Sequence, residues 1–459
     1  MAQLIRTRLY ALLTDRRLAR TFLGLIALGM TGVGKADIAD LSAPTLDRGL
    51  TRENFFDWVD FDADDMVLSW PSLNPELAAN RWTPYLAERF TYDDNIFRLP
   101  SAGAVPGAAS IGVRHDDINT LSAGIDGNLS VSGQRLEILA RADDNRFLQH
   151  GDLDNVSANV RGLYAWTLGN SLSGQVGGSY NRALTDFTDY YLVTQSFIFT
   201  KDIVSTRSLF ATAQMQLGSH WLLAAGVNHT DISQTADPGD EFKGDTPTFR
   251  AAYNTFGGGV VALEYQYARG DYGLPLDING FPVDRDFREQ TARIQLAAPL
   301  GDTLHLLASA GYVRHDYPQA SSYDFAAGIW DASLSWQAGA KTQVLLTGSQ
   351  RVYADIDAQA QYFVSKTARA IVQWSPTGKL KTELEFSRED QHFIGPNATA
   401  ATLNEATRNL IYSKRLNLAW SVSRALQLVL SGRLGNRDSN APALTYDDAL
   451  VSVSVRGRL

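Results

Sequence analysis

Cysteine is absent from the 459 residues, so the chain has neither disulfides nor a thiolate nucleophile. Long apolar runs are also lacking, and a mean hydropathy of −0.17 excludes a bundle of membrane-spanning helices. The formal net charge of −9 argues against nucleic acid as a partner. A Cys-free chain is suited to crossing an oxidising compartment before it folds.

Catalytic motifs are scarce as well. The seven His are scattered, and neither a zinc-protease helix motif nor a serine-hydrolase elbow occurs. His229 and His315 lie near acidic residues at the ends of polar segments, a proximity that is common by chance. GMTGVGKA, residues 29–36, approaches a phosphate-binding loop but has Ala36 where Ser or Thr would hold magnesium. We therefore expect no enzyme activity, no cofactor and no metal.

The first 36 residues have the layout of a secretory signal. Residues 1–20 carry five Arg, residues 21–34 are mostly apolar, and Gly34-Lys35-Ala36 offers small residues at a cleavage site. The apolar stretch is short for a spanning helix, which disfavours the alternative of a membrane anchor. We predict that residues 1–36 are removed and that the mature chain begins at Asp37.

From residue 81 onward, apolar residues recur at every second position. In INTLSAGIDGNLSVS, Leu121, Ile125 and Leu129 alternate with Ser, Asp and Asn, and the final ALVSVSVRGRL repeats the pattern. A period of two indicates strands with one apolar and one wet face. Eighteen such segments have the length of a tilted bilayer crossing, and they begin near residues 82, 117, 135, 155, 171, 204, 221, 246, 259, 287, 303, 323, 341, 363, 380, 405, 426 and 447.

The connections between these segments alternate in length. Short ones such as residues 299–302 and 375–379 carry the Gly and Pro of tight turns. An even number of strands (16–18) with this alternation predicts an antiparallel up-and-down barrel. Long polar loops separate the short turns at residues 93–116, 183–203, 231–247, 269–287, 351–363, 390–404 and 436–446.

Tryptophan separates this barrel from a soluble alternative. A propeller would show a blade period, which is absent, and a soluble core gives Trp no reason to collect at one end of each hairpin. We therefore predict that residues 81–459 form an all-β transmembrane barrel in a Gram-negative outer membrane, with its short turns in the periplasm. Lipid and the barrel-assembly machinery are the implied partners. Five Trp lie beside the short turns: Trp166, Trp221, Trp336, Trp374 and Trp420.

The acidic segment 37–80 lacks this pattern. It mixes Phe and Trp with Asp, and period two is not sustained. Two interpretations remain open, a periplasmic extension with one short helix or a segment directed into the barrel lumen. The Asp residues between Asp57 and Asp65 resemble part of a calcium loop but lack the Gly and closing Glu of an EF-hand, so we assign no metal there.

PYLAERFTYDDNIFRLP, residues 84–100, resembles the first-strand signature of the EpsL-type proteins of exopolysaccharide biosynthesis operons, which are grouped with β-barrel porins. The resemblance implies an outer-membrane exit for a secreted polysaccharide, with inner-membrane or periplasmic export components as further partners and no established catalytic residues. From the residues alone, the Asp and Asn of YDDN cap the start of the first long loop, a structural role at least as well supported as polymer contact. The matching residues are Tyr85, Tyr92, Asp93, Asp94 and Asn95, with Pro84, Phe97 and Arg98.

The inward parity of the strands predicts a hydrated lumen lined by amides, hydroxyls and charges, among them Asn119, Asn159 and Gln214. We interpret the mixed charges chiefly as cross-strand pairs, and the excess of Arg permits an anionic polymer without requiring one. Export of a polysaccharide is the predicted function, a diffusion porin for small solutes is the alternative, and an outer-membrane enzyme is disfavoured. The charged candidates are Arg141, Arg161, Arg250, Arg293, Arg369, Arg433, Arg456, Asp126, Glu137 and Glu264.

Overall fold

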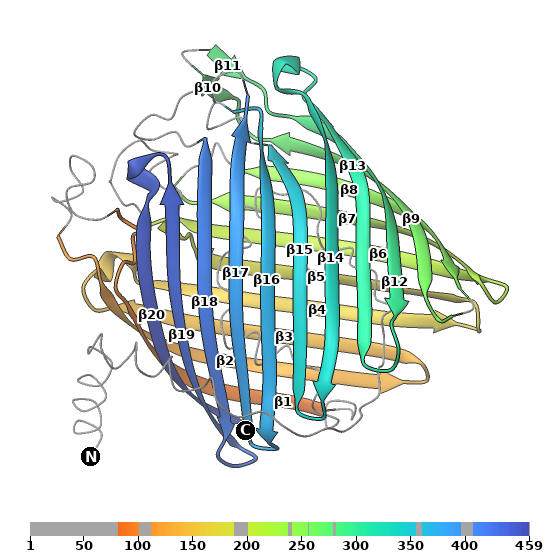
Figure 1. The fold of residues 1–459 in the computed structure, drawn as a ribbon. Coiled ribbons are helices and arrows are strands. Elements are labelled where there is room, and N and C mark those ends of the chain that lie inside the picture. The colour runs from red at the N-terminus through yellow and green to blue at the C-terminus, as the bar shows by residue number, and fades with distance from the viewer. Residues whose placement is uncertain are drawn as a thin grey trace.

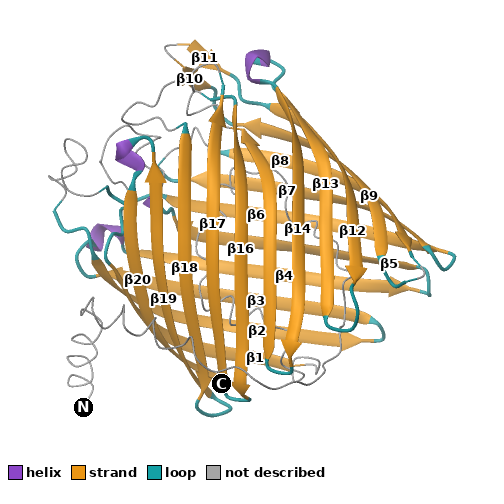
Figure 2. Ribbon diagram, viewed as in Figure 1, coloured by secondary structure: helices purple, strands orange, loops and turns teal. Residues whose placement is uncertain are grey.

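The computed structural model describes residues 81–100, 112–187, 201–236, 241–255, 257–278, 281–354, 360–395 and 407–458. Within these ranges the chain is almost entirely β-strand, as Figures 1 and 2 show. The predictions for the signal, residues 1–36, and for residues 37–80 fall outside the described residues. No helix in the described part of the chain is long and apolar enough to cross a membrane.

Eighteen strands form one antiparallel sheet in which sequence neighbours pair. They are β1 (Arg81–Asp93), β2 (Asp116–Val131), β3 (Gln134–Phe147), β4 (Asn155–Leu168), β5 (Leu172–Leu184), β6 (Ile203–Leu217), β7 (Trp221–Gln234), β8 (Phe242–Asn254), β9 (Val260–Tyr272), β12 (Phe287–Pro299), β13 (Leu304–Asp316), β14 (Phe325–Gly339), β15 (Thr342–Ala354), β16 (Tyr362–Thr377), β17 (Leu380–Ile394), β18 (Arg408–Ser421), β19 (Leu426–Ser439) and β20 (Tyr446–Arg458).

The sheet closes on itself. Strand β1 pairs with β2 on one side and with β20 on the other, from Tyr85 opposite Arg458 to Asp93 opposite Leu450. Closure leaves no strand edge with unpaired backbone groups, which is the condition for crossing lipid with strands. The predicted antiparallel barrel of eighteen strands is confirmed.

Sixteen of the eighteen strands begin within two residues of the predicted positions, and β8 and β18 do not. Strand β8 begins at Phe242 rather than near 246. Beyond the lipid a strand can carry polar residues on both faces, so residues 242–245 lack the alternation that marks the other strands. Strand β18 begins at Arg408 rather than near 405. The side chain of Asn440 accepts hydrogen bonds from the backbone N–H groups of Thr407 and Arg408 and so fixes the entry to this strand.

The predicted loop 269–287 contains regular structure that the sequence reading missed. Strands β10 (Leu276–Ile278) and β11 (Phe281–Val283) form a small hairpin that projects from the loop end of the barrel (Figure 1). The dipeptide Asn279-Gly280 between two apolar runs is a strong hairpin signal and would have predicted it. Among the described loop residues there are also three one-turn helices, η3 (Gly151–Leu153), η6 (Ser321–Tyr323) and η8 (Pro442–Leu444).

The outer face of the barrel is apolar. Large hydrophobic side chains such as Leu121 and Leu209 are about 60% exposed there, which a soluble protein would avoid. Trp82, Trp221, Trp336 and Trp420 are exposed near the short turns, and Tyr312 and Tyr412 are exposed nearer the loops. On β18, Tyr412 and Trp420 lie about 26 Å apart along the strand, which matches an apolar band flanked by aromatic girdles in lipid.

Candidate functional site: the inner wall of the barrel

The inner wall is the candidate site, and strand register identifies its residues. Side chains alternate between the two faces, so the neighbours of exposed Leu121 point inward, and Thr120 and Ser122 are accordingly buried. By the same alternation, the structure places all ten predicted charged residues on the inner face. The prediction that Asn119 lines the lumen was wrong, because it lies opposite Phe90 on the outer face. Near the loops a polar side chain on this face is hydrated and does not meet lipid.

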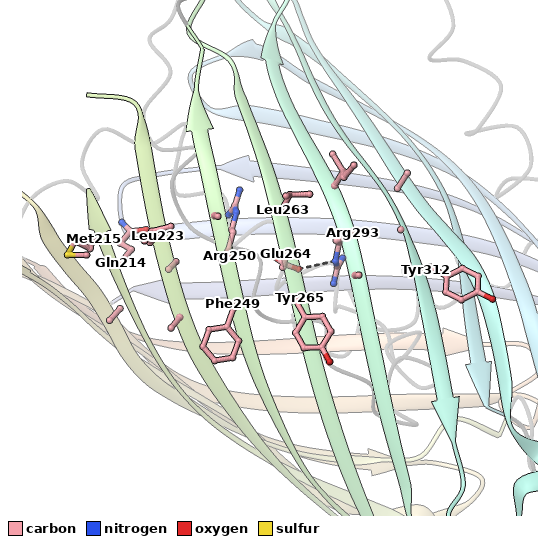
Figure 3. A pocket seen from close by; sticks show the side chains of 18 of the residues that line it. Gln214, Met215, Leu223, Phe249, Arg250, Leu263, Glu264, Tyr265, Arg293 and Tyr312 are labelled. Atoms are coloured by element: carbon pink, nitrogen blue, oxygen red, sulfur yellow. Dashed lines mark ion pairs between the residues drawn. The ribbon is translucent and has the colours of Figure 1, made fainter. Parts of the chain in front are cut away.

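Three charged residues meet on β8, β9 and β12 (Figure 3). Glu264 is the register partner of both Arg250 and Arg293, and its Oε1 lies 2.9 Å from Nε of Arg293. Gln295 donates a hydrogen bond of 3.0 Å to the other oxygen of Glu264. Gly311 of β13 is the register partner of Arg293 on β12, and a Cβ at Gly311 would lie 2.6 Å from Cβ of Arg293. Glycine therefore makes the room that Arg293 needs.

A second group lies near the short turns. The Arg456 guanidinium donates a hydrogen bond of 2.9 Å to Asp126 and lies 3.5 Å from the centre of the Tyr85 ring. Tyr85 is buried over Gly124, where a Cβ would approach the ring to 2.4 Å. Tyr85, one of the signature residues in the segment 84–100, thus supports a lumen ion pair.

The other predicted charges fall into two classes. Most are in ion pairs: Arg369 with Glu385 at 2.6 Å, Arg433 with Asp448 at 2.9 Å, Arg141 with Asp143 at 2.7 Å and Glu137 with Arg135 at 2.6 Å. Arg161 differs. It is exposed on β4, its register partners are Leu139 and Ser179, and it makes no hydrogen bond or ion pair with any described residue.

The signature residues 92–98 fold into the loop-side mouth of the barrel. Nη1 of buried Arg98 donates to both carboxylate oxygens of Asp93 at 2.9 Å, and it lies 3.8 Å from Asp448. Asp186 is a third carboxylate, 3.7 Å from Nε. Burial alone would lower the pKa of Arg98, but the carboxylates of Asp93, Asp448 and Asp186 raise the pKa well above its ordinary value. Arg98 stays charged in every accessible condition.

Asp94 and Asn95 tie this mouth segment to the last strand. Asp94 accepts a hydrogen bond of 2.7 Å from the backbone N–H of Ala449, and the Asn95 amide donates to the carbonyl oxygens of Leu99 and Asp447 at 2.9 Å. These contacts lock β1 to β20 where the barrel closes. Tyr92 points outward, with its ring 6.0 Å from His115.

Apolar packing also anchors the same segment at the mouth. Ile96, Phe97 and Leu99 are buried against Leu153 of η3 and Phe187, which follows β5. Phe97 also meets the His150 ring edge-on at 4.8 Å. Residues 94–100 therefore reach from β20 to the loops of β3–β5, a placement that the sequence did not predict.

A buried aromatic seam supports the opposite side of the mouth. Neighbouring rings stack with centroids 4.4–5.9 Å apart, in the order Phe242, Phe287, His315, Phe325 and Tyr362. His315 also contacts Glu289 at 2.9 Å, and both side chains are at most 3% exposed. An aromatic residue or histidine recurs at the loop end of several strands, and this regularity is the sequence signal for the seam.

The two candidate histidines do not combine into a catalytic group. His229 lies on the outer face with Asp245, 2.8 Å away, whereas His315 lies inside the wall. Within the described ranges, no group of three or more His, Asp or Glu residues could hold a metal ion.

The family model described as "Putative beta-barrel porin 2" matches residues 246–459. No curated protein matches the chain in sequence.

Among solved structures, OccK2 (OpdF) of Pseudomonas aeruginosa has a TM-score of 0.44 and 12% identity, covering 82% of this chain and 98% of its own. OccAB3 of Acinetobacter baumannii gives 0.43 and 10%, covering 82% and 99%. The siderophore receptor PirA of P. aeruginosa gives 0.41 and 10%, covering 82% and 80%. Because these TM-scores are below 0.5, the assignment of a porin-like barrel rests on this chain's own strand register.

Proposed function

We propose that this barrel is an outer-membrane conduit that exports an exopolysaccharide to the cell surface. The supporting observation is the chemistry of the inner wall, where amides, hydroxyls and carboxylates of neighbouring strands form hydrogen bonds with one another. Gln214 donates to Ser173 at 3.0 Å, Ser208 to Asn228 at 2.8 Å, and Asn417 to Glu383 at 3.2 Å. Such groups bind sugar hydroxyls weakly and repeatedly, and a moving polymer requires weak contacts because a tight site would stop it.

The two classes of lumen charge would have different roles in export. Paired arginines such as Arg293 and Arg369 brace the wall, because their charge is already matched by Glu264 and Glu385. Arg161 has no such partner among the described residues and is exposed, so its field extends into the lumen. An anionic polymer would be drawn in by this residue.

A second function is favoured by the mouth segment. Residues 94–100 are mostly buried at the loop-side mouth, between β20 and the loops of β3–β5, and a segment held there would narrow that side of the opening. A diffusion porin for small polar solutes needs only a narrow opening. The match to a porin family model over residues 246–459 is compatible with either function.

A deletion strain separates the two functions. Loss of surface polysaccharide with its accumulation in the periplasm is the result expected for export. Complementation with R161S should restore export only in part if the polymer is anionic, and R388S, which removes an exposed cation from the outer face of β17, should restore it fully. Normal secretion by the deletion strain, together with passage of only small solutes through purified protein in liposomes, would replace export with diffusion.

A further inference from the structure

Three arginines form a cationic cluster on the outer face of β9, β12 and β13, near the loops. Arg269 and Arg314 have side chains 65% and 64% exposed, and Arg288 is exposed as well. Their positions alternate correctly with outward Tyr265, Ala292 and Tyr312 on the same strands. We call Arg269, Arg288 and Arg314 the outer arginine cluster.

Carboxylates neutralise the cluster only in part: Asp245 is a register partner of Arg269, and Asp316 is a register partner of Arg288. Arg269 and Arg288 are direct register partners, and like charges placed opposite each other destabilise a sheet. Arg269 lies 3.4 Å from Asp271 and Arg314 2.9 Å from Asp316, both exposed contacts within one strand. Arg288 makes no ion pair with any described residue. An anion bound between these strands would relieve the repulsion.

Below the cluster, on the same strands, lies an apolar groove of about 950 Å³. Its rim is formed by Phe249, Leu263 and Tyr312, which are 56–61% exposed on the outer face (Figure 3). Arg250, Glu264 and Arg293 also border the groove, but their side chains point to the lumen. Small residues form the floor of this outer groove: Ala213, Ala225, Ala251, Ala292 and Ala310.

The groove and the cluster are continuous. Tyr265 at the groove rim donates a hydrogen bond of 3.3 Å to Gln290, and Gln290 is the register partner of Arg314. Tyr312 and Arg314 are successive outward residues of β13. A molecule with apolar chains in the outer groove would therefore carry its head group at the outer arginine cluster.

We propose that the outer groove and the outer arginine cluster bind one phosphorylated glycolipid of the outer leaflet. The arginines face the leaflet on the loop side, and guanidinium groups recognise phosphate with paired hydrogen bonds. Acyl chains gain little by leaving lipid for an apolar groove, so phosphate contacts supply most of the affinity and the groove selects the shape. This inference depends on the orientation of the barrel and not on the solute in its lumen.

Titration of the purified full chain in detergent with diphosphorylated lipid A, followed by native mass spectrometry, tests the proposal. The variant R269Q/R288Q/R314Q should bind the lipid at least about tenfold more weakly. The matched control K366Q/R388Q/R408Q removes the same charge from the outer face of β16–β18 and should bind within about twofold of the wild type. Lipid A without its phosphates should bind the wild type as weakly as intact lipid binds the cluster variant.

A second variant, A251F/A310F, fills the outer groove and leaves the charges in place. It should bind lipid A more weakly but inorganic pyrophosphate as the wild type does. Unchanged affinity for lipid A would show a simple anion site and overturn the glycolipid proposal. Equal binding by the cluster variant and its matched control would overturn it as well. Heat-dependent gel mobility establishes that each variant is folded.

Discussion

Two arginines of the inner surface show how one residue type can have opposite roles. Arg98 at the mouth is buried among Asp93, Asp448 and Asp186, and its Nη1 donates to the carboxylate of Asp93. Arg161 on the wall is exposed and contacts no described partner. The first arginine therefore stabilises the closure of the barrel, and the second is available to a solute.

The two arginines indicate different roles for the two regions: the signature residues at the mouth stabilise the closed barrel, and exposed wall residues such as Arg161 can contact a solute. Asp94 and Asn95 bond to the backbone of β20, and Asp93 holds Arg98, so none of the three is placed to grip a polymer. Their arrangement explains why the motif stands at the end of the first strand, where the ring of strands must close.

Replacing Arg98 should produce the largest effect. R98M leaves buried carboxylates without a counter-charge, and breaking a buried ion pair costs about 3–5 kcal/mol. The free energy of unfolding in urea, followed by heat-dependent gel mobility, measures the loss. R161M provides the comparison and should change it by less than about 0.5 kcal/mol. Equal losses in both variants would remove the distinction between mouth and wall.

Two glycines sharpen the comparison within the wall. G124A puts a Cβ 2.4 Å from the Tyr85 ring and displaces the stack over Arg456, at a cost of about 1–3 kcal/mol. G162A is the matched control, because no atom lies within 4 Å of the added Cβ. The midpoint of thermal unfolding should fall further in G124A than in G162A. A G124A variant more stable than G162A would contradict the described packing.

Reversal of the charge at Arg161 should change transport without changing stability. R161E places a carboxylate in the lumen and should reduce the preference for anions a few-fold, because the exposed charge acts on the entering ions. Reversal potentials in a salt gradient across planar bilayers measure this preference. R388E on the outer face should leave it unaltered, and an equal shift in both variants would indicate a surface effect.

The smallest expected effect is a pH response in the loop before β12. Burial, with a contribution from Asp284 and Asp271, raises the pKa of Asp286, whose carboxylate accepts the backbone N–H of Tyr272. A raised pKa means that the folded loop holds its proton more tightly than the unfolded loop. Its stabilising contribution is thus present in acid and is lost as the pH rises through that pKa. Exchange of the Tyr272 backbone amide hydrogen, corrected for its intrinsic rate, should become faster as the pH rises through the pKa of Asp286. The variant D286N should abolish this pH dependence.

The sequence was sufficient for the barrel because alternation is a local signal. Leu121 and Ser122 differ in face whatever surrounds them, and sixteen strand starts followed from this pattern. It was insufficient for the mouth, where Arg98 meets Asp186 and Asp448 through contacts set only when the barrel closes. The sequence also could not show which lumen charges are paired. Arg161 and Arg293 differ in the residue opposite them on the neighbouring strand, which is Leu139 for Arg161 and Glu264 for Arg293.

The central claim is that the inner wall lines a hydrated conduit, and adjacent positions of β4 test it in this Cys-free chain. R161C places a thiol on the inner face, and V160C places one on the outer face, where Val160 is 41% exposed. Single-channel current across a planar bilayer is recorded before and after a bulky, water-soluble thiol reagent is added. The account predicts a stable fall in current for R161C and none for V160C. An unchanged current through R161C, or a fall through V160C alone, would contradict it.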